Sequence, residues 1–168
     1  MNMKEFTESP RMAGYVFPAE WEQQEAVILS CPLNSQTWPD NRAAMEKAYA
    51  AFASAISRFE TVRLICKAEA QAHYRELLAE AAADFTRVQF YDLPTNDAWC
   101  RDHGPIFIRQ KQTGERAIVD FNYNAWGGKF SPWDADNAVP KRMAALLGLP
   151  IVQVPLTCEG GALEVNGA

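Results

Sequence analysis

Ten consecutive residues, NDAWCRDHGP at positions 96–105, combine side chains that catalyse reactions with side chains that bind charged ligands. A catalytic cysteine needs a lowered thiol pKa, usually from a histidine within hydrogen-bond reach or from a helix amino terminus. Along a strand, residues i and i+3 point to opposite faces, so Cys100 and His103 would meet only if the chain doubled back. His73 lies on the mostly polar surface of a predicted helix and is placed worse. These residues favour a structural Cys100 in one wall of a site whose nucleophile lies elsewhere.

Three other stretches carry more polar and aromatic residues than packing requires. They are FPAEWEQQE at 17–25, DFNYNAWGG at 120–128 and CEGG at 158–161. Each lies at the end of a predicted strand, where ligand sites collect in α/β sheets. Purely structural interpretations stay open: packing for the tryptophans, a turn for the paired glycines, and an Asx-turn or helix cap for one aspartate. The residues concerned are Trp21, Trp38, Trp126, Trp133, Gly127, Gly128 and Asp97.

The first half of the chain alternates strands with helices. Short apolar runs at 25–31, 61–66 and 87–92 predict strands, and segments 39–59 and 68–83 predict helices. Asp40 or Asn41 is expected to cap the first helix. The apolar stripe expected on that helix consists of Ala44, Ala48, Phe52, Ala55, Ile56 and Phe59. This alternation predicts an α/β fold whose sheet is at least partly parallel.

The second half predicts a ββαβ unit. Runs 105–110 and 116–122 flank KQTGE and indicate an antiparallel hairpin. A helix over 134–150 follows, with Gly148 as its C-terminal cap and Pro150 beyond, and then a strand at 151–156. The earlier half resembles a similar unit that lacks its first strand. A last strand is expected at 162–165, before a turn at Asn166 and Gly167, and it has no second half. We therefore expect the amino-terminal part of a longer protein.

Composition narrows the class of protein. The chain has 168 residues, 48% of them hydrophobic, and a net charge of -5. Length and hydrophobic content predict one domain. Together with the unfinished last strand, this gives the expectation of one partial domain over 1–168 with a flexible lead-in over 1–14. No stretch concentrates Lys and Arg as a nucleic-acid footprint needs. No signal peptide or membrane-spanning run is visible, so we expect a cytoplasmic protein with neither membrane nor nucleic-acid partners. The four cysteines are widely spaced and indicate reduced thiols rather than a zinc site or a disulfide framework.

Five motifs, in order and spacing, resemble the agmatine deiminase and bacterial peptidylarginine deiminase family of guanidine-modifying penteins. They are FPAEWEQQEAVIL, TWPDN, TNDAWCRDHGPIFI, DFNYNAWGGK and EGGALEVNG, and the resemblance runs from about residue 15 to the last residue. It implies an α/β propeller of ββαβ modules around a pseudo-five-fold axis, of which this chain forms about half. It also implies hydrolysis of a guanidinium group to a ureido group with release of ammonia. No metal or organic cofactor is implied.

The resemblance assigns roles to individual residues. Asp102 and Glu159 would be the carboxylates that hold the guanidinium cation, and Trp99 would pack on the substrate. Gly160 and Gly161 would let the backbone come close beside Glu159. The residues expected to orient these groups are Asp97, Arg101 and Asn124.

The family's catalytic histidine and cysteine are expected after the EGG motif, and this sequence stops at Ala168, before either. His103 fills a motif position that is usually small and polar. The resemblance thus implies a binding wall that is inactive alone and that associates with itself through exposed propeller edges. Agmatine, which would yield N-carbamoylputrescine, is favoured because the spacing from PAEWE to TNDAW resembles that branch. A peptidylarginine deiminase, an amidinotransferase and a non-catalytic guanidinium-binding or assembly module are the alternatives.

Overall fold

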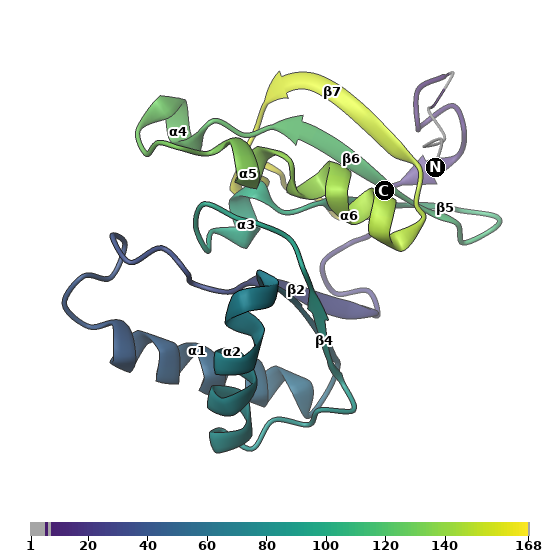
Figure 1. Cartoon of the computed structure of the whole chain (residues 1–168). Helices are drawn as coiled ribbons and strands as arrows, with labels where there is room; N and C mark the ends of the chain where they lie inside the picture. The colour runs from purple at the N-terminus through teal and green to yellow at the C-terminus, as the bar shows by residue number, and fades with distance from the viewer. Residues whose placement is uncertain (1–5, 7, 168) are drawn as a thin grey trace. The chain divides into compact units, whose positions relative to one another are not determined.

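The computed structural model describes residue 6 and residues 8–167 (Figure 1). The chain folds into two compact units. The parallel-sheet unit is Gln23–Cys100, and the mixed-sheet unit combines Met1–Glu22 with Arg101–Ala168. The flexible lead-in expected over 1–14 falls in part on residues 1–5 and 7, outside the described residues. The single partial domain expected over 1–168 stays a prediction.

The parallel-sheet unit confirms the predicted alternation of strands and helices. Its strands β2 (Ala26–Ser30), β3 (Thr61–Ile65) and β4 (Val88–Tyr91) are parallel and lie in the order β2-β3-β4. Helix α1 (Arg42–Ser57) connects the first two strands, and α2 (Ala68–Glu80) connects the second two. Both helices pack on the same core, which contains Ala50 and Ala53 of α1, Tyr74 and Leu78 of α2, and Leu64 of β3. Parallel neighbours require such crossover helices, which explains the spacing of the apolar runs.

The apolar stripe expected on α1 is wrong as a prediction of its packed face. Phe52 and Phe59 are 56% and 83% exposed. The buried residues of the helix are Glu46, Ala50, Ala53, Ser54 and Ser57. Asn41 takes the N-cap position, as one of the two expected residues, but its side chain makes no capping hydrogen bond.

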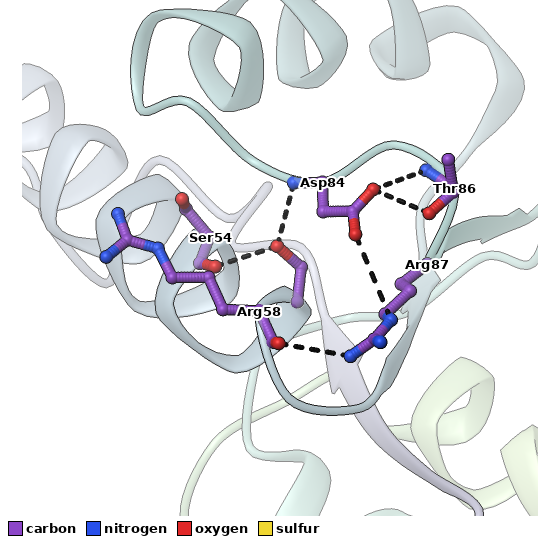
Figure 2. Close-up of polar contacts among 6 residues, drawn as sticks. Ser54, Arg58, Asp84, Thr86 and Arg87 are labelled. Atoms are coloured by element: carbon purple, nitrogen blue, oxygen red, sulfur yellow. Dashed lines mark hydrogen bonds and ion pairs between the residues drawn. The ribbon is translucent and has the colours of Figure 1, made fainter.

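Polar residues pack inward on α1 because each finds a partner. The Ser54 hydroxyl donates to the Ala81 carbonyl at 2.7 Å, and the Ser57 hydroxyl donates to the Ser54 carbonyl at 2.7 Å. The Ser57 oxygen also accepts from the Asp84 backbone N–H at 2.9 Å (Figure 2). A buried hydroxyl with its hydrogen bonds satisfied carries little penalty. The packed face is therefore set by the connection after α2.

That connection is itself held by local bonds (Figure 2). The Asp84 carboxylate accepts from the backbone N–H and the hydroxyl of Thr86, at 3.0 and 2.6 Å. Arg87 donates to the Arg58 carbonyl at 3.1 Å, just past the end of α1. The turn between α2 and β4 is thus hydrogen-bonded to the carboxyl end of α1.

The mixed-sheet unit contains the predicted ββαβ arrangement. Strand β5 (Ile106–Gln110) pairs antiparallel with β6 (Arg116–Asn122), and β6 pairs parallel with β7 (Ile151–Thr157). The crossover from β6 to β7 contains α5 (Asp134–Asn137) and α6 (Val139–Leu147), where one helix was expected. Gly148 caps α6 at φ 65°, as predicted. A short strand that was not predicted, β1 (Tyr15–Val16), completes the order β1-β5-β6-β7.

The strand expected at 162–165 is wrong for the described part of the chain. A 3-10 turn, η1 (Gly160–Ala162), occupies its start. Leu163 beyond it is extended, at φ −106° and ψ 125°, yet residues 163–167 pair with no strand within residues 6 and 8–167. Extended backbone becomes a strand only when a neighbour takes up its hydrogen bonds. The outer strands of the two sheets are β2 and β4, and β1 and β7; self-association through such edges stays a prediction.

Candidate functional site

The carboxyl ends of β6 and β7 bring two of the motif segments to one edge of the mixed sheet. The strands run parallel, and the Cys158 backbone N–H bonds the Asn122 carbonyl at 3.1 Å just where they end. Asn124 follows β6, and Glu159 follows β7. This is the edge at which α/β sheets place their ligands.

Helix α3 (Cys100–His103), which was not predicted, lies against the turn that carries Glu159. A Cβ atom added to Gly160 would meet the Arg101 carbonyl oxygen at 2.1 Å, and one on Gly161 would lie 3.8 Å from Oδ1 of Asp102. Only glycine at position 160 allows this approach of two backbone segments. The contact brings Asp102 and Glu159 together although they are distant in sequence.

The electrostatics of Asp102 reflect this arrangement. Burial raises the pKa of the Asp102 carboxyl, and the negative charge of Glu159 raises it further. His103 and Arg101 partly offset these effects. Two half-buried carboxylates thus share one environment and repel each other, as like charges in a common site do. A cation placed between them would relieve that repulsion.

Arg101 lies at the rim of the site. Its side chain is 60% exposed, and its guanidinium lies 3.6 Å from the Glu20 carboxylate. Its backbone carbonyl oxygen and its guanidinium Nη1 both lie against Gly160, where an added Cβ would meet them at 2.1 and 2.9 Å.

A buried acid that the sequence analysis missed lies beneath the site. Nε2 of His103 is 3.9 Å from Oδ1 of Asp136 on α5, and the His103 and Asp136 side chains are 0% and 3% exposed. The His103 ring also meets the edge of Tyr123, with centroids 5.8 Å apart. A small cavity between His103 and Asp102 is lined by Tyr123, Cys158 and Gly160 as well. Asp136 lies in DADN, beside the exposed Asp134, and nothing in the sequence marks it as the buried one.

Asn124 shapes a left-handed turn. Its side chain accepts a hydrogen bond from the Gly127 N–H at 2.8 Å, at the start of α4 (Ala125–Gly128). Ala125, Trp126, Gly127 and Gly128 have φ of 50°, 57°, 83° and 77°. Left-handed backbone costs roughly 1–2 kcal/mol per residue that is not glycine, so Asn124 and the two glycines hold a strained segment. The turn interpretation of the paired glycines is therefore confirmed.

The strained turn displays aromatic rings. Trp126 lies with its ring centroid 5.7 Å from that of Tyr123 and 5.7 Å from that of Phe130. The Trp126 and Phe130 side chains are 37% and 62% exposed. Edge-to-face packing of this kind holds large rings in place at a surface.

In the parallel-sheet unit, Asp97 and Trp99 contact the TWPDN segment. The Asp97 carboxylate accepts from the Thr37 hydroxyl at 2.7 Å and from the N–H of the next residue, Ala98, at 2.8 Å, and its interpretation as an Asx-turn or a helix cap stays a prediction. The Trp99 ring lies 6.1 Å from the Trp38 ring at an interplanar angle of 32° and is 43% exposed. Asp97 thus fixes the backbone next to a tryptophan that is partly open to solvent.

The chain's two histidines both have acidic partners. His73 on α2 lies 3.1 Å from the Glu46 carboxylate, and His103 lies against Asp136. Cys100 is half-buried at the start of α3, where its backbone N–H bonds the Ala98 carbonyl at 2.8 Å. The structural role expected for Cys100 stays a prediction.

Two features that would indicate other classes of function are absent from the described residues. Within residue 6 and residues 8–167, no group of three or more His, Cys, Asp or Glu side chains is arranged to hold a metal ion. No helix of the same residues has the length and apolar character that crossing a membrane requires.

Comparisons with known proteins agree with the resemblance seen in the motifs. A model of the family described as Porphyromonas-type peptidyl-arginine deiminase matches residues 16–168. The agmatine deiminase of Stutzerimonas stutzeri (strain A1501) is 35% identical over 170 residues, covering 98% of this chain and 45% of that protein. The structure of the agmatine deiminase of Enterococcus faecalis aligns with a TM-score of 0.86 and 29% identity, over 98% of this chain and 45% of the other. An agmatine deiminase of C. jejuni with substrate bound aligns with a TM-score of 0.77 and 30% identity, over 91% and 43%.

The chain spans less than half the length of these relatives. Its α/β sheets form part of a pentein propeller, as the motifs implied. With its motifs, its ββαβ topology and a family match over most of its length, the chain belongs to the Porphyromonas-type peptidyl-arginine deiminase family.

Proposed function

We propose that this chain supplies the cation-binding wall of a guanidine deiminase that hydrolyses agmatine to N-carbamoylputrescine and ammonia. Asp102 and Glu159 hold the guanidinium group in this proposal. The nucleophilic cysteine and the general-base histidine belong to a part of the enzyme that these 168 residues do not include, so the chain alone is inactive. The observation that carries the proposal is the close approach of the Gly160–Gly161 turn to Arg101 and Asp102, which sets Glu159 near enough for its charge to raise the pKa of Asp102.

The physical argument starts from the cost of an unneutralised carboxylate pair. Two half-buried anions that repel each other destabilise the empty site, and a monovalent planar cation removes much of that penalty. A guanidinium group also presents paired N–H donors that match the two oxygens of a carboxylate. A compact ammonium group offers no such flat, paired geometry. Asp102 and Glu159 therefore suit a guanidinium better than an amine.

The remaining site residues have supporting roles in the proposal. Asp97 holds the backbone beside Trp99, whose partly exposed ring offers a surface for an alkyl chain or a cation. Asn124 closes the left-handed turn after β6. These contacts position the groups that would touch the substrate, and we assign them no chemical step.

The substrate is proposed from the relatives. Those of S. stutzeri and E. faecalis are agmatine deiminases, and agmatine is also the substrate that the motif spacing favours. This extends the proposal to a cytoplasmic step in putrescine formation. The name of the matching family favours peptidyl-arginine as the second candidate. The two substrates differ at the far end of the molecule, where agmatine carries an amine and arginine adds a carboxyl group.

Calorimetric titration of the chain with agmatine tests the carboxylate pair. Asp102→Asn should weaken binding by about 10- to 150-fold, the worth of a charge-assisted pair of about 1.5–3 kcal/mol. Asp120→Asn is the matched control, because burial also raises the pKa of Asp120, but its neighbours are Gln153 and Lys141. The proposed binding of the guanidinium by Asp102 would be contradicted if both substitutions weakened agmatine binding equally, or if Asp102→Asn did not weaken it.

Activity assays separate the other parts of the proposal. We expect no ammonia from the 168-residue chain and release of ammonia from a chain extended through the family's histidine and cysteine. Ammonia from the short chain would show that its nucleophile is present after all. Comparing agmatine with arginine and with an arginine-containing peptide in the extended chain decides between the two substrates.

A further inference from the structure

Two buried cysteines lie side by side at the ends of neighbouring strands in the parallel-sheet unit. Cys31 follows β2 and Cys66 follows β3, and both are 0% exposed. The strands pair in register up to Ser30 and Ile65, and the Cys31 N–H continues the ladder to the Ile65 carbonyl at 2.9 Å. The two thiols are close enough to share a hydrogen bond.

The position of this pair fits the geometry of a disulfide. In-register neighbours on adjacent strands have Cα atoms about 5 Å apart, inside the window of about 4.4–6.8 Å that disulfides span. Their side chains point to the same face of the sheet, because both belong to the core that α1 and α2 cover. Closing the bond therefore requires rotation of two side chains rather than movement of the backbone.

We propose that Cys31 and Cys66 are a redox-active dithiol that closes to an intramolecular disulfide when the protein meets hydrogen peroxide. In the first step, one thiolate sulfur attacks the peroxide, an S–O bond forms, the O–O bond breaks, and water leaves after protonation. In the second step, the other thiol attacks that sulfenic acid, the S–S bond forms, and a second water leaves. Two thiols lose two electrons in total, and the peroxide accepts them.

The surroundings of the two thiols indicate which one attacks the peroxide and which one attacks the sulfenic acid. The hydrogen bond from Cys31 lowers the pKa of the Cys66 thiol, whereas burial raises the pKa of the Cys31 thiol. Burial and the negative charges of Glu69 and Asp92, which lie near the start of α2, offset part of this lowering of the Cys66 pKa without reversing it. Cys66 is thus the sulfur that meets the peroxide, and Cys31 resolves the sulfenic acid. Local opening admits the small oxidant, after which the second step is fast because its partner is already in contact.

Pairing, rather than exposure, is what distinguishes these two thiols. Cys100 and Cys158 are half-buried and therefore more accessible than Cys31 and Cys66. The Cys158 thiol lies 3.5 Å from the Glu159 carbonyl instead of a second thiol. If exposure alone governed oxidation, these two would react and the buried pair would stay reduced.

Peroxide treatment of the folded chain, followed by alkylation under denaturing conditions and peptide mass spectrometry, tests the proposal. Titratable thiols should fall from four to two. The peptides carrying Cys31 and Cys66 should appear linked and two hydrogens lighter, and dithiothreitol should restore them. The same linkage should form when Cys100 and Cys158 are both replaced by Ser, and Cys66→Ser should abolish it.

The control is the chain oxidised in denaturant, where pairing is unselective. In the folded chain, the Cys31–Cys66 linkage should exceed every other pairing by at least about tenfold, as a preformed contact requires. Linkage through Cys100 or Cys158, or oxidation of Cys66 to a sulfinic acid without a disulfide, would overturn the proposal. The proposal would also be overturned if Cys31 and Cys66 stayed reduced after peroxide treatment of a chain that circular dichroism shows to be folded.

Discussion

Replacing Gly160 by alanine tests whether the contact between the Glu159 turn and α3 builds the site. The added Cβ would lie 2.1 Å from the Arg101 carbonyl oxygen, against an ordinary contact of about 3.5 Å. The two backbone segments would therefore have to separate by more than about 1 Å. Overpacking of this kind costs about 1–3 kcal/mol in the free energy of unfolding. The same displacement would pull Glu159 away from Asp102 and should weaken agmatine binding by about 10- to 100-fold.

Gly161→Ala is the matched control. Its added Cβ would lie 3.8 Å from the Asp102 carboxylate, an ordinary contact, so we expect a stability change within about 0.5 kcal/mol and little effect on binding. Urea titration gives the free energies of unfolding, and calorimetry gives the affinities. If Gly160→Ala were as stable and bound agmatine as tightly as Gly161→Ala, the close contact would not be what brings the two carboxylates together.

Three further predictions concern charge and packing. The raised pKa of Asp102 means that its ionised form costs stability near neutral pH, and that this cost disappears as the pH falls through the raised pKa. Asp102→Asn should therefore raise the free energy of unfolding near neutral pH by about 0.5–1 kcal/mol, seen as a higher urea midpoint than that of wild type, and the gain should disappear in acid. An unchanged urea midpoint near neutral pH would refute the repulsion between Asp102 and Glu159. For Glu46, burial raises the carboxyl pKa, but hydrogen bonds from Arg42 and His73 outweigh it and leave the pKa lowered. Glu46→Gln should thus cost about 1–3 kcal/mol near neutral pH, with the difference from wild type vanishing as the pH falls through that lowered pKa; a difference that persists in strong acid would contradict the ion pairs. Phe59 is 83% exposed and Ala53 is 0% exposed. Phe59→Ser should therefore change the free energy of unfolding by less than about 0.5 kcal/mol, whereas Ala53→Val should lower it by about 1–3 kcal/mol. A larger loss for Phe59→Ser than for Ala53→Val would show that the apolar stripe is the packed face.

The element order followed from the sequence because its signals are local. Apolar runs of strand length, helix formers without internal Gly or Pro, and a glycine after α6 predicted the strands, both long helices and the Gly148 cap. Short elements were missed for the same reason. Helix α3 and strand β1 contain four and two residues, too few for any periodicity to be visible.

The choice of packed face on α1 was outside the reach of such signals. Spacing alone favoured the stripe with Phe52 and Phe59, and the structure buries Glu46, Ser54 and Ser57 instead. Each of the three has at least one hydrogen-bond partner on α2 or on the connection after it, which the sequence of α1 does not contain. A polar residue is stable in a core when its partners are present, so the tertiary contacts decide.

By itself, the sequence determined the α/β class, the ββαβ order and the motif residues that identify the family, because each depends on residues close together in the chain. The motifs implied that Asp102 and Glu159 meet, and the tertiary structure shows the backbone approach that brings them together. Only the tertiary structure decided that His103 meets Asp136 and that Cys31 meets Cys66. Each of these pairs joins separate elements through a strand register or a close backbone approach. Such contacts form only when distant segments pack, and no local pattern of residues encodes them.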